Sequence, residues 1–122
     1  MSKRILMVSD DPDIRQILQD RLHSYGYVVE VAIGGNAALE ALRCDGFDGM
    51  LVDIAIPQIE GLAVVYQVRA SHPTLPVVII TALFDLERSI QAVIGDGPQA
   101  YLPKPFDAAQ LKKVIEHWVG RP

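Results

Sequence analysis

The chain has 122 residues, of which 50% are hydrophobic and 21% are charged, and its formal net charge is −4. This length and composition predict one globular domain over residues 1–122, large enough to bury a core without disulfides or a structural metal. The acidic balance and the lack of a basic stripe argue against direct binding to nucleic acid. A single cysteine excludes an internal disulfide, and no apolar run is long enough for a signal peptide or a membrane span. We therefore expect a cytoplasmic protein that does not bind membranes.

Five short runs rich in β-branched residues alternate with helical patterns along the chain. These runs predict strands at Arg4–Val8, Val28–Ala32, Gly49–Asp53, Pro76–Ile80 and Ala100–Leu102. Most of the runs are continuously apolar, which is typical of parallel strands covered on both faces. Glu30 interrupts the second run, so we expect that strand at an edge of the sheet.

Between and after these runs, apolar residues recur at helical spacing. The first helix is predicted to begin after an Asp11 N-cap, with Pro12 at its first position, and to end at Gly26. The other predicted helices are Asn36–Arg43, Glu60–Ser71, Leu86–Ile94 and Asp107–Val119. The last one opens with a capping-box pair, Asp107 and Gln110, and is expected to bury Leu111, Val114, Ile115 and Trp118. The repeated strand–helix alternation predicts a doubly wound α/β fold with a five-stranded parallel sheet.

Polar residues follow four of the predicted strands at or near the point where each strand ends. They are Asp10, Asp53, Thr81 and Lys104. Carboxyl ends of parallel strands share one edge of a sheet, which is where ligands bind in such folds, so these side chains are expected to converge. Two nearby carboxylates repel each other unless a cation or a proton lies between them, and Mg²⁺ is the natural cation for carboxylate and phosphate oxygens. The pattern indicates Mg²⁺-dependent phosphoryl chemistry.

Each of these residues also has a simpler structural explanation. For Asp10 and its neighbour Asp11 this explanation is a helix cap, which is favoured for Asp11 but less so for Asp10, because one cap is enough. Asp53 alone fits a turn before the following proline about as well as it fits a reactive group. Thr81 alone fits the end of a strand, and a loop lysine such as Lys104 is usually solvated. However, prolines on both sides of Lys104 restrict where its ammonium points, and Pro105 is a candidate for a cis peptide bond.

Four segments, in this order along the chain, resemble the receiver domain of two-component response regulators. They are Arg4–Arg15, Val52–Pro57, Val78–Ala82 and Tyr101–Phe106. The last segment and the helix after it are also similar to receivers of the nitrogen-regulator type. The resemblance implies a flavodoxin-like (βα)5 fold with strand order 2-1-3-4-5.

The resemblance also implies roles for individual residues. Asp53 would be the phospho-acceptor, and Asp10 and the backbone carbonyl of Ala55 would complete the protein's share of a Mg²⁺ or Mn²⁺ site. Thr81 and Lys104 would bind the phosphoryl oxygens. Tyr101, which as a residue type fits either a core position or a switch, would turn inward when Thr81 moves toward the phosphate.

This chain departs from the family pattern at the first acidic position. The family usually has two acidic residues where this chain has Ser9-Asp10, so Ser9 takes the first acidic place and Asp11 the variable third. Ser9 and Asp11 would then contribute to the metal only indirectly, for example through a bound water. Because one formal charge is missing, Mg²⁺ binding is expected to be weaker.

The resemblance implies a phosphorylation-dependent signalling switch rather than a metabolic enzyme, with self-catalysed phosphotransfer and autodephosphorylation. Its partners would be a histidine kinase or phosphotransfer protein, an output domain or partner protein, and a second copy bound through the last two helices. Ser9 and the bulky pair Leu83-Phe84 favour an alternative, a degenerate receiver that binds partners without phosphorylation. A phosphatase with an Asp nucleophile is disfavoured because Ala55 stands where its acid/base Asp would be. The kinase, the signal and the output stay open, as does whether the chain stands alone or belongs to a longer regulator.

Overall fold

The computed structural model describes residues 2–9, 11–43, 46–54, 59–81 and 99–122. Its strands are β1 (Arg4–Val8), β2 (Val28–Ala32), β3 (Gly49–Ile54), β4 (Val77–Thr81) and β5 (Gln99–Pro103). The helices of the described part are α1 (Pro12–Ser24), α2 (Gly35–Arg43), α3 (Ile59–Ser71) and α5 (Ala108–Trp118). These elements confirm the corresponding predictions, while the predicted helix Leu86–Ile94 lies outside the described residues.

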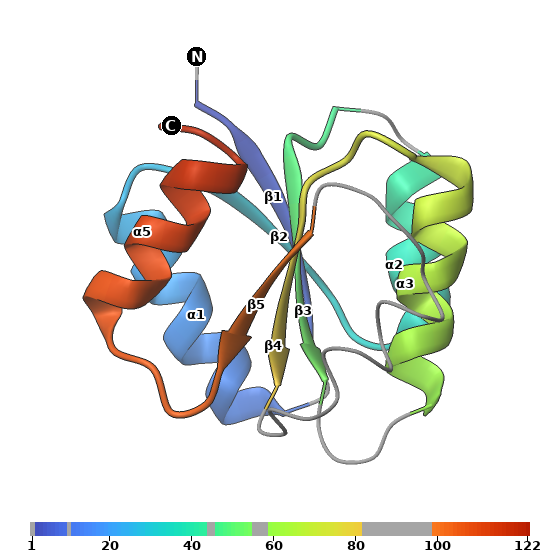
Figure 1. Ribbon diagram of the computed structural model, residues 1–122, viewed down its shortest axis with the longest axis horizontal. Helices are drawn as coiled ribbons and strands as arrows, with labels where there is room; N and C mark the ends of the chain where they lie inside the picture. The colour runs from blue at the N-terminus through green and yellow to red at the C-terminus, as the bar shows by residue number, and fades with distance from the viewer. Residues whose placement is uncertain (1, 10, 44–45, 55–58, 82–98) are drawn as a thin grey trace.

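The five strands form one parallel sheet in the order β2-β1-β3-β4-β5. Helices α1 and α5 cover one face of this sheet, and α2 and α3 cover the other (Figure 1). The strands point toward one edge, and both chain termini lie at the opposite edge (Figure 1). This is the doubly wound, flavodoxin-like arrangement that the alternation and the resemblance predicted, and β2 lies at an edge as expected.

Alternate residues of each strand supply two hydrophobic cores, one on each face of the sheet. The core under α2 and α3 includes Leu6, Val8, Met50, Val52, Val77 and Ile79. The core under α1 and α5 includes Ile5, Met7, Leu51, Val78, Ile80 and Leu102. The same alternation puts Ser9, two residues after Met7, and Asp53, two residues after Leu51, on the α1/α5 side.

The helix boundaries follow from their capping residues. The Asp11 carboxylate accepts hydrogen bonds from the backbone N–H groups of Asp13 and Ile14, at 2.9 and 3.3 Å, and Pro12 follows it. Gly26, just beyond the end of α1, has a φ of 100°, a conformation that favours glycine. The capping box of Asp107 and Gln110 is complete at the start of α5. All these predicted caps are confirmed.

The predicted burial of Trp118 is wrong, since this side chain is 36% exposed. Trp118 is the last residue of α5, and the C-cap residue Val119 is buried in its place and lies over Gly49. Ile17 and Tyr66 also follow the helical spacing of apolar residues, but each is 55% exposed. The helices therefore bury a narrower stripe than the spacing alone indicates.

Candidate functional site

The site is built around Asp53, the penultimate residue of β3. Its register partner on the neighbouring strand is Ile80, near the carboxyl end of β4. The side chain of Asp53 is only 2% exposed, although the residue lies at the edge of the sheet where the strands end. Burying a carboxylate is unfavourable unless other groups compensate its charge and satisfy its oxygens.

Lys104 supplies the compensating charge. Its Nζ lies 2.6 Å from Asp53 Oδ1, and its side chain is 25% exposed. Lys104 follows the end of β5, and the Lys104–Pro105 peptide bond is cis, as the flanking prolines suggested. The ion pair joins β3 to the loop after β5, across β4. The simpler explanation of Lys104 as a solvated loop residue is therefore wrong for this structure.

Ser9, directly after β1, contacts the other oxygen of the carboxylate. Its hydroxyl donates a hydrogen bond to Asp53 Oδ2 at 3.1 Å, and the residue is 1% exposed. The backbone N–H of Asp11 donates to Ser9 Oγ at 3.2 Å. The Asp11 carboxylate itself serves as the cap of α1, which confirms the structural interpretation of that residue.

Thr81 and Tyr101 occupy neighbouring strands of the same sheet. Thr81 ends β4 and pairs in register with Ile54 on one side and Pro103 on the other. Tyr101 pairs with Ile79 and packs, half-buried, against the core under α2 and α3. Asp10 and Ala55 lie outside the described residues, so the predicted convergence is seen for Asp53, Lys104 and the backbone position of Thr81.

The donor chemistry of the described part fits a hard divalent cation. Asp53 offers carboxylate oxygens at the edge of the sheet where the strands end, beside the Lys104 ammonium and the Ser9 hydroxyl. Among the described residues, no three His, Cys, Asp or Glu side chains cluster closely enough to hold a metal on their own. A Mg²⁺ ion bound at Asp53 would therefore need further ligands besides the described side chains.

Two arginines make polar contacts that were not predicted from the sequence. Arg15 Nη1 donates to the backbone oxygen of Ser9 at 3.0 Å. Arg69 is buried on α3 and donates to the backbone oxygens of Pro73 and Leu75 at 3.1 and 2.9 Å. Burial lowers the pKa of the Arg69 guanidinium, and the electrostatic influence of Tyr101 opposes this shift. The position of Arg69, four residues after buried Val65, was the sequence signal for its burial.

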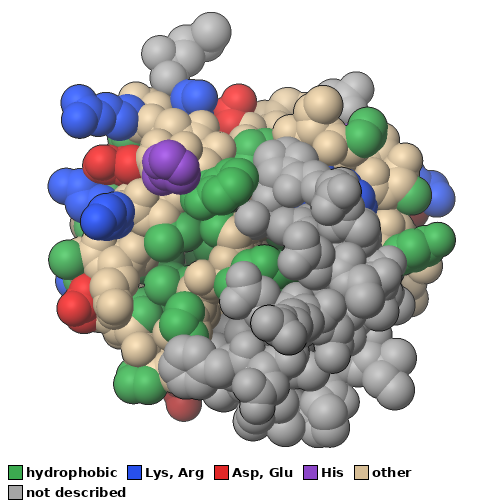
Figure 2. All heavy atoms as spheres, in the orientation of Figure 1, with side chains coloured by type: hydrophobic (Ala, Val, Ile, Leu, Met, Phe, Trp, Pro, Cys, Tyr) green, Lys and Arg blue, Asp and Glu red, His purple; other side chains and the backbone are tan. Residues whose placement is uncertain are grey.

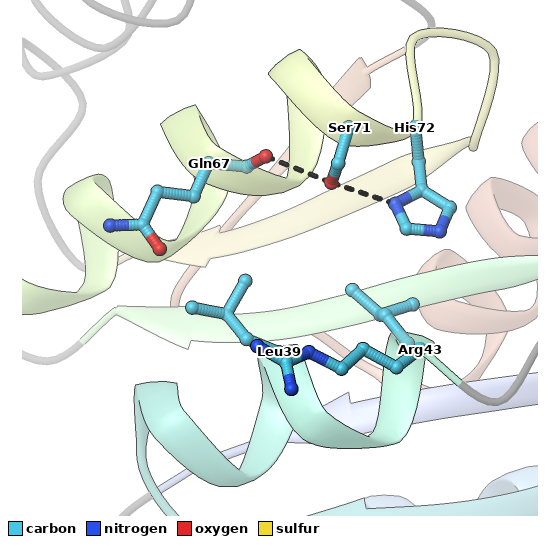
Figure 3. A pocket seen from close by; sticks show the side chains of 6 residues that line it. Leu39, Arg43, Gln67, Ser71 and His72 are labelled. Atoms are coloured by element: carbon cyan, nitrogen blue, oxygen red, sulfur yellow. Dashed lines mark hydrogen bonds between the residues drawn. The ribbon is translucent and has the colours of Figure 1, made fainter.

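A hollow of about 290 Å³ lies between the C-terminal halves of α2 and α3, away from Asp53. Leu39 and Arg43 on α2 face Gln67 and Ser71 on α3 across it (Figure 3). Ser71 Oγ lies 2.8 Å from His72 Nδ1 and also donates to the Gln67 backbone oxygen. None of the residues that line this hollow is a carboxylate, so it differs from the site at Asp53.

The surface agrees with the charge expectation. Figure 2 shows basic side chains interspersed with acidic side chains and a histidine on the side of α5, rather than a basic stripe on this face. In the described part of the chain, no helix is long and apolar enough to cross a membrane.

Comparison with known proteins places this arrangement in a family. The model of the response regulator receiver domain matches residues 5–116. The chain belongs to the response regulator receiver domain family. Receiver domains are signalling modules of two-component systems, not metabolic enzymes, and phosphoaspartate and Mg²⁺ are standard features of the family.

Two curated relatives show how far the similarity extends. Response regulator MprA of Mycobacterium ulcerans is 38% identical over 111 residues, which cover 91% of this chain and 47% of MprA. The DNA-binding transcriptional regulator NtrC of Salmonella typhimurium is 37% identical over 116 residues, 95% of this chain and 24% of NtrC. The chain thus spans about half of MprA and a quarter of NtrC. The NtrC match supports the resemblance to nitrogen-regulator receivers.

Solved structures of receivers share the fold. Chemotaxis protein CheY4 of Vibrio cholerae superposes with a TM-score of 0.85 at 26% identity, covering 97% of this chain and 99% of CheY4. The receiver domain of sensor histidine kinase PA1611 of Pseudomonas aeruginosa has a TM-score of 0.81 at 25% identity, covering 98% and 99% of the two chains. That receiver holds a magnesium ion in its active-site cleft.

Proposed function

We propose that this receiver is a phosphorylation-dependent switch in which Asp53 accepts a phosphoryl group from a histidine kinase or a phosphotransfer protein. The observation that supports it best is the buried Asp53 carboxylate, held by Lys104 on one oxygen and Ser9 on the other. A carboxylate is a weak nucleophile, so positioning and charge compensation must supply most of the rate. These two contacts supply both.

In the transfer step, an Asp53 oxygen forms a bond to phosphorus while the bond from phosphorus to the donor histidine nitrogen breaks. The nitrogen leaves with the electron pair of that bond. Lys104, whose side chain is partly exposed, moves from Asp53 to the transferred phosphoryl oxygens, where its charge offsets theirs. The Thr81 hydroxyl donates a hydrogen bond to an oxygen of the same phosphoryl group.

Asp10, Asp53 and the carbonyl oxygen of Ala55 would hold Mg²⁺, or Mn²⁺ in its place. The bound ion supplies charge neutralisation between the carboxylates and the incoming phosphoryl group. Ser9 reduces the charge of this ligand set, so a lower Mg²⁺ affinity is part of the proposal. Asp11 contributes to the site only by capping the N-terminus of α1.

After transfer, Thr81 moves toward the phosphoryl group and Tyr101 turns inward. This change biases a surface that includes α5, β5 and the predicted helix Leu86–Ile94 between two states. The surface contacts an output domain, a partner protein or a second copy of the chain, in the cytoplasm and without direct contact to nucleic acid or membrane. Hydrolysis of the aspartyl phosphate by the domain itself resets the switch.

Intact-mass spectrometry after incubation with acetyl phosphate, with and without Mg²⁺, tests this function. The proposal expects one phosphoryl adduct that needs Mg²⁺, is absent from Asp53→Asn and persists in Asp20→Asn, a matched change of an exposed aspartate on α1. An adduct that survives Asp53→Asn would overturn the assignment. A histidine-phosphate donor serves as a second trial where the small donor gives no adduct.

The neutral hydroxyl of Ser9 favours one second candidate, a receiver that binds its partner without phosphorylation. Such a module would bind that partner equally well as wild type and as Asp53→Asn. A partner that binds only the phosphorylated wild-type protein would exclude it.

A further inference from the structure

The contacts of Ser9 leave one preferred acceptor for its hydroxyl proton. The Asp11 backbone N–H donates to Ser9 Oγ at 3.2 Å, so the hydroxyl oxygen already accepts a hydrogen bond. Its proton can reach Asp53 Oδ2 at 3.1 Å or the Asp11 backbone oxygen at 3.5 Å. The carboxylate contact is the shorter one and its acceptor is charged, so it is the stronger hydrogen bond.

The backbone of Ser9 is fixed as well. Its carbonyl oxygen accepts a hydrogen bond from Arg15 Nη1 at 3.0 Å, which ties the end of β1 to the first turns of α1. Only 1% of Ser9 is exposed, so bulk water has little access to the hydroxyl. The donor is therefore held in place before any ligand binds.

The two oxygens of Asp53 are engaged from two directions. Lys104 contacts Oδ1 from the loop after β5, and Ser9 contacts Oδ2 from the end of β1. Two contacts on different oxygens fix the rotation of the carboxylate plane, which a single ion pair would leave free. Once Lys104 moves to a phosphoryl group, the Ser9 hydrogen bond is the one of these two contacts that remains on the carboxylate.

We propose that Ser9 is a positioning residue that aligns the Asp53 carboxylate through a neutral hydrogen bond, independently of the divalent cation. The inference rests on the proposed function of Asp53. An acidic residue at position 9 would add charge for the cation and repel Asp53, whereas the hydroxyl donates to Asp53 and adds no charge. In this receiver, nucleophile alignment and Mg²⁺ affinity are therefore separate properties.

Three substitutions at Ser9 separate these properties. Ser9→Ala removes the hydroxyl, Ser9→Thr keeps it, and Ser9→Asp replaces it by a charge. The first readout is the Mg²⁺ dissociation constant from calorimetry. The second is the rate of adduct formation with acetyl phosphate at saturating Mg²⁺. The third is the ¹³C resonance of the Asp53 carboxylate in metal-free protein.

Ser9→Ala is expected to slow adduct formation about tenfold, because a misaligned nucleophile reacts more slowly, while the Mg²⁺ dissociation constant changes less than about twofold. It also shifts and broadens the metal-free Asp53 resonance. Ser9→Thr restores both properties, and Ser9→Asp tightens Mg²⁺ binding about tenfold. Ser24→Ala, which removes an exposed hydroxyl at the end of α1, is the matched control and changes none of them.

Two results would overturn the inference. Unchanged rate and resonance in Ser9→Ala would make Ser9 a space-filling residue, and a parallel loss of rate and Mg²⁺ affinity would place its hydroxyl in the metal site instead. Urea unfolding of each variant checks that the domain folds. Where Ser9→Ala does not fold, Ser9→Cys, whose thiol is only a weak donor, should show the same slower rate and shifted resonance, and an unchanged rate and resonance would overturn the inference. If wild type takes no phosphoryl group, the proposed function fails, but the metal-free resonance still reports whether Ser9 holds Asp53.

Discussion

The two edges of the sheet use polar side chains in different ways. At the carboxyl edge, Ser9 and Lys104 both bind the side chain of Asp53. At the amino edge, by contrast, hydrogen bonds join side chains to the backbone, and the side-chain ion pair of Arg4 with Glu30 is exposed. Lys3 Nζ donates to the backbone oxygen of Val119 at 3.0 Å, and the Tyr27 hydroxyl donates to the backbone oxygen of Gly120 at 2.6 Å. The backbone N–H of Arg4 donates to Asp48 Oδ2 at 2.8 Å.

If the proposed function holds, the amino edge serves stability and the carboxyl edge serves the reaction. A side chain that binds a backbone group satisfies a partner whose position the fold already determines, and it fastens the chain past α5 to the sheet. Side chains that bind each other across three segments can exchange partners when a ligand enters. Changes at the carboxyl edge should therefore alter phosphorylation, and changes at the amino edge should alter only stability.

Lys104→Met tests the carboxyl edge and has the largest expected effect. The phosphoryl group loses its ammonium partner, so the rate of adduct formation falls about 100-fold. Stability falls by about 3 kcal/mol because Asp53 stays buried without an opposite charge. Urea unfolding and timed mass spectrometry measure both effects.

The control for this prediction is the double variant Lys104→Met/Asp53→Asn, which removes the buried charge and should recover most of the stability. Phosphorylation of Lys104→Met at the wild-type rate would contradict the role of Lys104.

Gly49→Ala tests the amino edge. A Cβ at Gly49 would overlap Val119 Cγ2, so the substitution should cost about 2 kcal/mol of unfolding free energy by overpacking. The rate of adduct formation should stay at the wild-type value. The double variant Gly49→Ala/Val119→Ala should lose less unfolding free energy than the two single variants lose together. If the losses simply add, the overlap is relieved elsewhere.

Tyr27→Phe has the smallest expected effect and removes only the hydroxyl that binds Gly120. The loss of this hydrogen bond should reduce stability by about 1 kcal/mol without changing phosphorylation. Tyr66→Phe, at an exposed tyrosine on α3, is the matched control.

The buried phenol of Tyr27 should also make the stability of the domain depend on pH. Burial first, and the charge of Glu116 second, raise the pKa of the Tyr27 phenol above its ordinary value of about 10. The unfolded chain then releases this proton at a lower pH than the folded protein. The stability that Tyr27 contributes is thus complete below the ordinary value and is lost as pH rises through the higher folded-state pKa. Tyr27→Phe should lose less stability between pH 9 and 11 than wild type does; an identical loss would show that other groups cause it.

Much of the fold could be predicted because local signals agreed with one another. Most of the strand runs were continuously apolar, and the Asp11 cap and the Asp107–Gln110 capping box marked where α1 and α5 begin. Burial at helix ends was less predictable, because Trp118 fits the helical spacing but Val119, one residue later, occupies the space above Gly49.

The site could be predicted in outline because carboxyl ends of parallel strands share an edge. That rule brings Asp53 and Lys104 together from the order of strands along the chain. It could not reveal which atoms meet. The contact of Ser9 with Asp53 depends on a rotamer and on the turn at Asp11, and the buried Arg69 depends on the loop carbonyls that surround it.

The most direct test of the central claim is to locate the phosphoryl group. Wild-type protein treated with acetyl phosphate and Mg²⁺ is reduced with borohydride, which converts an aspartyl phosphate to homoserine, and is then digested and mapped by tandem mass spectrometry. The account predicts modification at Asp53 alone, and none when Mg²⁺ is removed with a chelator. Modification at another aspartate such as Asp11 or Asp48, or equal modification without Mg²⁺, would contradict it.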